Sequence, residues 1–151
     1  MSGGLSDLYQ EVILDHSRHP RNFGPAEGAN RRARGNNPLC GDRVTVYLTM
    51  AGERIADARF EARGCAISVA SASMMTEMIK GRTVAEAKSL FARFRALVTT
   101  GDGMAEGDGE LEELESLSGV RAFPTRIKCA TLAWHAMSAA LDGSNEEVKT
   151  E

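Results

Sequence analysis

The chain lacks the features that mark membrane, secreted and nucleic-acid-binding proteins. No apolar run among its 151 residues approaches the length of a membrane span. The formal net charge of -3 argues against general nucleic-acid binding, which needs an excess of basic residues. The start of the chain, residues 1–4, has no basic segment followed by an apolar one, so no secretory signal is expected. These absences predict a cytoplasmic protein that binds neither membranes nor nucleic acids.

Cysteine is also scarce, with three residues, Cys40, Cys65 and Cys129, that lie far apart in the sequence. An odd number of cysteines without a secretory signal indicates a reducing compartment and argues against a framework of disulfides. The length suits one domain, and 42% hydrophobic with 26% charged residues is typical of a soluble globular protein. We therefore expect one domain over residues 1–151, with a disordered tail over 144–151.

Apolar residues recur with helical spacing in much of the chain. Thr83 and Glu86 have the spacing of a capping box, and Pro124 can open the last helix. A glycine-rich stretch over residues 99–109 is expected to be a mobile loop. The spacing predicts helices over residues 5–16, 65–80, 83–98, 111–117 and 124–141.

Two segments, residues 44–50 and 56–62, alternate apolar and polar side chains, which predicts half-buried strands. Residues 51–53 between them suit a hairpin turn, and residues 29–34 are expected to add a third strand. The order of elements is one helix, then strands, then several helices. It predicts an α+β fold in which helices cover a small antiparallel three-stranded sheet.

The three cysteines and one carboxylate can form a complete metal site. Only Gly41 separates Cys40 from Asp42, and glycine takes backbone angles that could aim both side chains at one point. Cys65 stands at a predicted helix start, where the helix dipole lowers a thiol pKa, and Cys129 lies near the start of another helix. Zinc prefers such ligands in a tetrahedron. Taken alone, however, a cysteine is more often a small buried hydrophobe, and these spacings match no zinc-finger pattern, so spacing leaves both interpretations open.

The chain contains five distinctive motifs in a fixed order: L-Y-Q-E-V-I-L-D-H at 8–16, P-R-N-F-G at 20–24, N-P-L-C-G-D at 37–42, G-C-A-I-S-V-A-S at 64–71 and R-I-K-C-A-T-L-A-W at 126–134. Together they resemble the SufU/IscU family of iron–sulfur cluster assembly proteins, also called NifU-like. The last three are similar to the ligand motifs of that family. The resemblance covers the chain from about residue 8 to residue 141.

The resemblance implies a fold, a ligand set and partners. The fold is the α+β sandwich of SufE/NifU-like proteins. The metal ligands are Cys40, Asp42, Cys65 and Cys129. The partner is a SufS-like cysteine desulfurase, a pyridoxal-phosphate enzyme that carries sulfur as a persulfide, and scaffold components of the SUF system follow downstream.

Two departures from the scaffold-type IscU pattern favour the SufU branch. Scaffold members carry histidine immediately before the third cysteine, where this chain has Lys128. They also carry an L-P-P-V-K segment for an Hsp70-type chaperone, where residues 123–128 read F-P-T-R-I-K. The glycine-rich and acidic stretch over 99–119 resembles an insertion of the SufU branch. That branch implies a zinc-dependent sulfurtransferase.

We therefore expect Zn²⁺ to be bound by the four ligands, with Cys40 as the catalytic sulfur acceptor. Cys40 lies on a loop beside a glycine, and its thiolate could attack the outer sulfur of a persulfide, as in thiol–disulfide exchange. Three thiolates and a carboxylate leave about two units of excess negative charge around the ion. Arg126 and Lys128 are the expected neighbouring cations, because helical spacing keeps them near Cys129.

Two other functions stay open from the sequence. The protein could be a scaffold for a transient [2Fe–2S] cluster, although such clusters normally use four thiolates or histidine as a substitute. It could also be a non-enzymatic adaptor with a structural zinc site, since such sites are closed and inert. His16 and His19 have H-x-x-H spacing, and for both a structural or docking role is expected.

Overall fold

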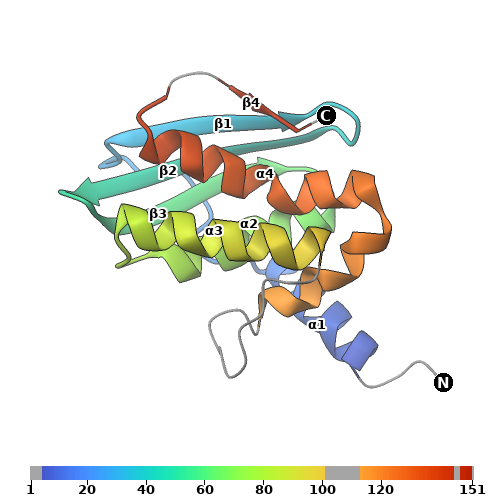
Figure 1. Ribbon diagram of the computed structural model, residues 1–151. Coiled ribbons are helices and arrows are strands. Elements are labelled where there is room, and N and C mark those ends of the chain that lie inside the picture. Colours follow the sequence, from blue (N-terminus) through green and yellow to red (C-terminus); the bar gives the residue numbers. More distant parts are fainter. Residues whose placement is uncertain (1–4, 101–112, 145–146, 151) are drawn as a thin grey trace.

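The structure of the protein, a computed structural model, describes residues 5–100, 113–144 and 147–150. The predicted order of one helix, three strands and several helices is confirmed (Figure 1). The glycine-rich loop beyond Thr100 and the start of the predicted acidic helix lie outside the described residues. The elements are α1 (Leu5–Arg18), β1 (Arg31–Asn37), β2 (Asp42–Ala51), β3 (Arg54–Arg63), α2 (Ala66–Ile79), α3 (Val84–Thr99), the 3-10 helix η2 (Leu114–Ala122), α4 (Pro124–Leu141) and β4 (Val148–Lys149).

The sheet has four strands in the order β3-β2-β1-β4, so the predicted three-stranded sheet is wrong in strand number. β1, β2 and β3 pair antiparallel as expected, whereas β4 pairs parallel with β1 and makes the sheet mixed. β4 belongs to the tail over 144–151, for which no regular structure was expected. It is two residues long and pairs through main-chain groups, as the hydrogen bond from Thr150 N to Asn36 O (3.1 Å) shows. So short a strand has no side-chain periodicity by which it could be predicted.

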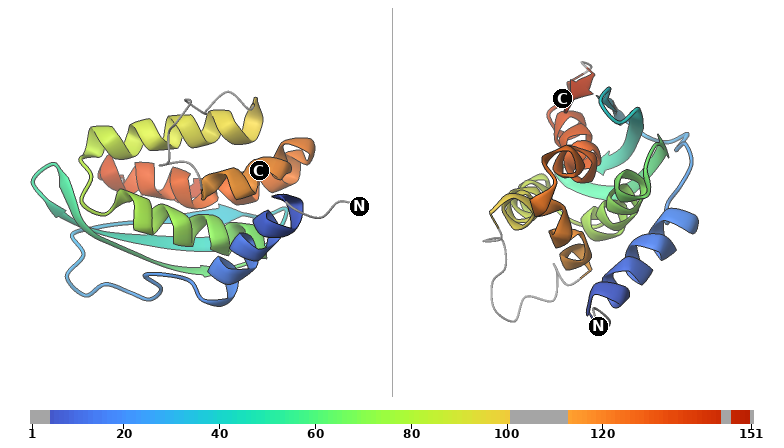
Figure 2. Two further views of the ribbon diagram at one scale, coloured as in Figure 1. Left: turned by 90° about the horizontal axis from the view of Figure 1, so that it is seen from below. Right: turned by 90° about the vertical axis from the view of Figure 1, so that its right-hand side faces the viewer.

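The molecule is layered on one side of this sheet. Helices α2 and α4 lie against one face, α3 and η2 lie beyond them, and α1 packs on α2 (Figures 1 and 2). The inward side chains of β2 and β3 are buried, and their outward neighbours are exposed or half-buried, which confirms the predicted alternation. Because α2 and α4 are covered on both sides, they need apolar and small residues around most of their circumference. This explains why Trp134 of α4 is fully buried and stacks on Phe91 and Phe94 of α3.

Local signals fix the helix starts. The Thr83 side chain accepts the Glu86 N–H, and the Glu86 carboxylate accepts the Thr83 N–H, so the predicted capping box is confirmed. Pro124 is the first residue of α4, as expected from its fixed φ and missing N–H. No helix within the described ranges has both the length and the apolarity that crossing a lipid bilayer requires.

The three cysteines meet at one end of the sheet. Cys40 lies in the turn between β1 and β2, and Arg43 at the start of β2 pairs with Arg63 at the end of β3. Cys65 follows that strand end as the N-cap of α2. Cys129 lies in the second turn of α4, whose first half reaches the same end (Figure 1). The topology thus brings together three segments that are remote in sequence.

His135 makes the stability of the α3–α4 contact depend on pH. It is half-buried, and its ring meets Phe91 edge-on with centroids 4.9 Å apart. Burial lowers the pKa of His135, and the positive charge of Arg95 lowers it further. The unfolded chain therefore binds more protons than the native one below about pH 6.5, and stability falls as the pH falls through that range.

We predict that His135→Gln flattens this dependence. Chemical denaturation at pH 7.5 and pH 5 should show a smaller loss of unfolding free energy in the variant than in the wild type. The exposed His19 offers the matched control, because His19→Gln should keep the wild-type loss. Equal losses in His135→Gln and wild type would contradict the burial argument.

Candidate metal centre

Three potential ligands converge at the end of the sheet. One ligand atom each of Cys40, Asp42 and Cys129 lies within 4.8 Å of the other two. Asp42 and Cys129 are fully buried, whereas Cys40 is exposed. A single small cation could therefore contact all three groups, and Cys40 would be its ligand on the solvent side.

Cys65 joins this group through Asp42. Its backbone N–H donates to Asp42 Oδ1 (2.9 Å), and its Sγ lies 3.8 Å from Asp42 Oδ2. Cys65 is half-buried and caps α2. The structure thus brings all four expected ligands together. Ligand atoms of Cys40, Asp42 and Cys129 are close to one another, and the Cys65 sulfur lies beside the Asp42 carboxylate.

Two glycines allow this arrangement. Gly41 has φ +71°, a conformation that favours glycine, in the turn between Cys40 and Asp42. Gly64 has φ +151°, and a Cβ built on it would lie 2.2 Å from Asp42 Oδ1. A role for Gly41 was expected from the sequence, whereas the role of Gly64 was not, because it depends on a residue 22 positions away in the chain.

The charges of the four potential ligands favour a bound cation. Burial is the main cause that raises the pKa of the Cys129 thiol, and the side-chain contacts with Asp42 and Cys40 raise it further. Without a metal, Cys129 therefore keeps its proton at neutral pH. A bound divalent ion reverses this preference, since a coordinating thiol is deprotonated. The set of three thiols and one carboxylate fits zinc, which takes sulfur and oxygen ligands in a tetrahedron.

Of the two expected neighbouring cations, only Arg126 is placed beside the thiols by the described contacts. Charge on Cys65 and Cys129 raises the pKa of Arg126, and a side-chain hydrogen bond with Cys65 adds to the effect. Arg126 is exposed, so its guanidinium borders the site from the solvent side. Lys128 is half-buried, and its carbonyl accepts the Thr150 hydroxyl (3.3 Å). No described contact brings the Lys128 ammonium to the cysteines.

Asn37 also lies at this site, and no role for it was expected from the sequence. Its side chain is fully buried at the end of β1, and Nδ2 lies 3.6 Å from Cys129 Sγ. The only signal in the sequence is its position at the start of the N-P-L-C-G-D motif.

A pocket of about 840 Å³ opens beside the site. It lies between α1, the first turn of α2, η2 and the start of α4, and Cys65 forms part of its wall. The other lining side chains include the apolar residues Ile13, Ile67, Val120 and Phe123. Among the described residues that line it, Arg126 alone carries a full charge.

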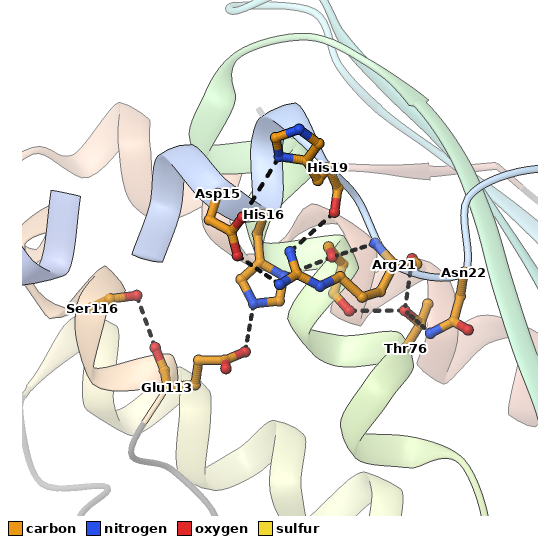
Figure 3. A network of polar contacts seen from close by, with 9 residues as sticks. Asp15, His16, His19, Arg21, Asn22, Thr76, Glu113 and Ser116 are labelled. Carbon is orange, nitrogen blue, oxygen red and sulfur yellow. Dashed lines mark hydrogen bonds and ion pairs between the residues drawn. The ribbon is translucent and has the colours of Figure 1, made fainter. Parts of the chain in front are cut away.

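A second polar cluster supports α1 rather than the cysteines (Figure 3). His16 is buried, with Nδ1 2.7 Å from Ser73 Oγ on α2 and Nε2 2.6 Å from Glu113 Oε1 before η2. The Arg21 N–H also donates to Ser73 Oγ (2.9 Å). His16 therefore links three segments of the chain, in line with the structural role expected for it.

Comparisons with known proteins agree on one family. Residues 8–150 match the family described as NifU-like N terminal domain. The zinc-dependent sulfurtransferase SufU of Bacillus subtilis is 42% identical over 90% of this chain and 90% of its own length. The iron–sulfur cluster assembly scaffold protein IscU of Streptococcus pyogenes is 40% identical over 93% of this chain and 86% of its own length.

The fold agrees with a solved structure as well. A putative iron–sulfur cluster assembly scaffold protein for the SUF system, from Fervidobacterium islandicum, superposes with a TM-score of 0.79 at 34% identity, covering 91% of this chain and 99% of its own.

We predict that Gly64→Ala disrupts the centre. The new Cβ would clash with Asp42 Oδ1 and strain the backbone, so the free energy of unfolding should fall by about 1–3 kcal/mol. Zinc affinity, measured by competition with a chelator, should fall by about 10–100-fold. Gly119→Ala is the control, because open space surrounds Gly119, and it should change stability by no more than about 0.5 kcal/mol. If Gly64→Ala and Gly119→Ala have the same stability and the same zinc affinity, Gly64 is not needed to position the Asp42 carboxylate.

Proposed function

Because the chain belongs to the NifU-like N-terminal domain family of iron–sulfur cluster assembly proteins, we propose that it is a zinc-dependent sulfur acceptor that takes persulfide sulfur from a cysteine desulfurase. The observation that carries the proposal is the donor set, in which two cysteines and one aspartate lie within 4.8 Å of one another and Cys65 adjoins them. This set suits zinc. The similarity to a relative named zinc-dependent sulfurtransferase supports the same metal.

The unequal exposure of the cysteines supports Cys40 as the acceptor. Cys129 is buried and Cys65 is half-buried at a helix start, whereas Cys40 is exposed in a turn beside Gly41. A partner carrying a persulfide could reach the Cys40 sulfur without opening the core. Zinc, when bound, would keep the cysteines deprotonated.

The transfer itself is an exchange at sulfur. The Cys40 thiolate attacks the outer sulfur of the donor persulfide, and a new sulfur–sulfur bond forms on Cys40. The bond within the donor persulfide breaks, and its electron pair leaves with the donor cysteine as a thiolate. The transferred sulfur keeps its proton or its charge, so the exchange needs no external oxidant or reductant.

Arg126 supports this exchange electrostatically. Its exposed guanidinium interacts with the Cys65 side chain and lies in the wall of the pocket beside the site. A persulfide and a departing thiolate are both anions at neutral pH, and a fixed cation at the entrance attracts the first and stabilises the second. Arg126 would thus favour arrival of the donor as well as offset part of the charge of the centre.

A second function, the scaffold for a [2Fe–2S] cluster, is supported by the relatives named as IscU scaffold proteins, one of them 40% identical. The donor set weighs against it. Clusters normally take four cysteines, or histidine in place of two, whereas this site offers three cysteines and Asp42. The sulfur acceptor is therefore the function that the geometry supports best.

We predict that Cys40→Ala abolishes sulfur acceptance. Wild-type protein incubated with a cysteine desulfurase and cysteine should gain the mass of one sulfur atom on Cys40, and desulfurase turnover should rise. Cys40→Ala should gain no sulfur and leave turnover at the level of the desulfurase alone. Peptide mass spectrometry locates the added sulfur. Undiminished stimulation by Cys40→Ala, with sulfur on another residue, would rule out Cys40 as the acceptor.

We also predict that the purified protein is colourless and binds one zinc ion per chain. At a free zinc concentration 100 times Kd, the free energy of unfolding should exceed that of the chelator-treated protein by about 2.7 kcal/mol, because only the native state brings the ligands together. Metal analysis and chemical denaturation measure both. A brown protein with acid-labile sulfide would favour the scaffold, and zinc without effect on any desulfurase would favour a structural adaptor.

A further inference from the structure

Asn37 contacts three of the four potential ligands of the metal centre, as strand partner or through hydrogen bonds. It is the last residue of β1, and its strand partner across the turn is Asp42. Its carbonyl accepts the Cys40 N–H (3.3 Å), which closes the turn that carries Cys40. The backbone of Asn37 therefore sets the position of two of the four ligands.

The side chain of Asn37 reaches a third ligand. It is fully buried, and Nδ2 lies 3.6 Å from Cys129 Sγ, within the range of an N–H···S hydrogen bond. Oδ1 is buried as well and has no hydrogen-bond partner among the described residues. A buried amide that leaves its oxygen unpaired is costly, and an apolar residue of similar size would avoid this cost. The sequence nonetheless has an amide here, so its N–H donor needs an explanation.

The Cys129 sulfur is the group that needs this donor. Within α4, the Cys129 sulfur contacts the Thr125 carbonyl (3.5 Å), which can accept a hydrogen bond from a thiol but repels a thiolate. A metal-bound Cys129 is a thiolate, and a buried thiolate is stabilised by N–H donors. The exposed Cys40 can instead be solvated by water.

We propose that Asn37 is a positioning residue that donates its side-chain N–H to the metal-bound Cys129 thiolate and so keeps Cys129 on the metal while Cys40 accepts sulfur. The claim about sulfur acceptance by Cys40 rests on the proposed function, whereas the claim that Asn37 donates to the Cys129 thiolate does not. The hydrogen bond from Asn37 makes Cys129 a more firmly held sulfur ligand than Cys40. Cys129 is buried and hydrogen-bonded, and Cys40 is exposed on a turn.

The native protein tests the hydrogen bond without any substitution. Loaded with ¹¹³Cd²⁺ in place of zinc, the wild-type protein should show a scalar coupling between cadmium and one Asn37 side-chain amide proton, transmitted through the N–H···S contact. That proton should also shift on metal loading. Absence of the coupling, together with an amide resonance that does not move between metal-free and loaded protein, overturns the proposal.

Variants then test what the hydrogen bond does. Asn37→Ala should weaken zinc binding by about 10–100-fold in a chelator competition. It should also move the thiolate-to-metal charge-transfer band of the Co²⁺-loaded protein to lower energy, because a thiolate without its donor is easier to oxidise. Asn37→Asp, which replaces the donor by a negative oxygen, should weaken binding more than Asn37→Ala. A loss of stability alone would not shift the band.

Asn36→Asp is the matched control. Asn36 is the neighbouring residue on the same strand, half-buried on the opposite face, and its variant should bind zinc within twofold of wild type. An Asn37→Ala protein with wild-type zinc affinity and an unshifted Co²⁺ band overturns the proposal.

Retention of zinc during sulfur transfer separates the two proposals. After incubation with a desulfurase, wild type that carries sulfur on Cys40 should keep its zinc, whereas Asn37→Ala should release zinc as Cys40 accepts sulfur. Equal zinc retention in wild type and Asn37→Ala would show that Asn37 does not keep Cys129 on the metal. If wild type accepts no sulfur at all, the proposed function fails, and the cadmium and cobalt measurements still decide whether Asn37 stabilises the Cys129 thiolate.

Discussion

The buried carboxylate of Asp42 is the constraint on which the rest of the site depends. It is fully buried, accepts the Cys65 N–H at 2.9 Å, and lies within 4.8 Å of ligand atoms of both Cys40 and Cys129. Burying one such charge is costly, and gathering three thiols around it adds more negative charge as soon as they ionise. A cation is the simplest way to stabilise this group, so the fold gathers side chains whose combined charge a bound metal ion would balance.

The fold makes the ligands differ in freedom. Cys129 is held in a helix packed on the sheet, and Cys65 is held at a helix start by its N–H bond to Asp42. Cys40 lies in an exposed turn, and its charge, like that of Cys65 and Cys129, acts on the guanidinium of Arg126. A site with one accessible sulfur and two fixed ones suits transfer of a group to that sulfur. A purely structural metal site has no need of such a difference.

The sequence predicted most of the fold because most of it is periodic. β2, β3 and the helices carry apolar residues at regular spacing, and Thr83 marks a helix start through local chemistry. β4 was missed because two residues paired through the main chain have no periodicity. The meeting of the ligands was inferred from family motifs, since their spacing alone left it open. The roles of Gly64 and Asn37 were missed because each depends on a distance to a remote residue, Asp42 and Cys129 respectively.

X-ray absorption at the zinc K-edge of the zinc-loaded protein tests the central claim most directly. The arrangement of Cys40, Asp42, Cys65 and Cys129 predicts a first coordination shell of three sulfur atoms at about 2.3 Å and one oxygen atom at about 2.0–2.2 Å. A shell with two sulfur atoms or fewer, or one dominated by nitrogen, would contradict the claim that these four side chains bind one ion.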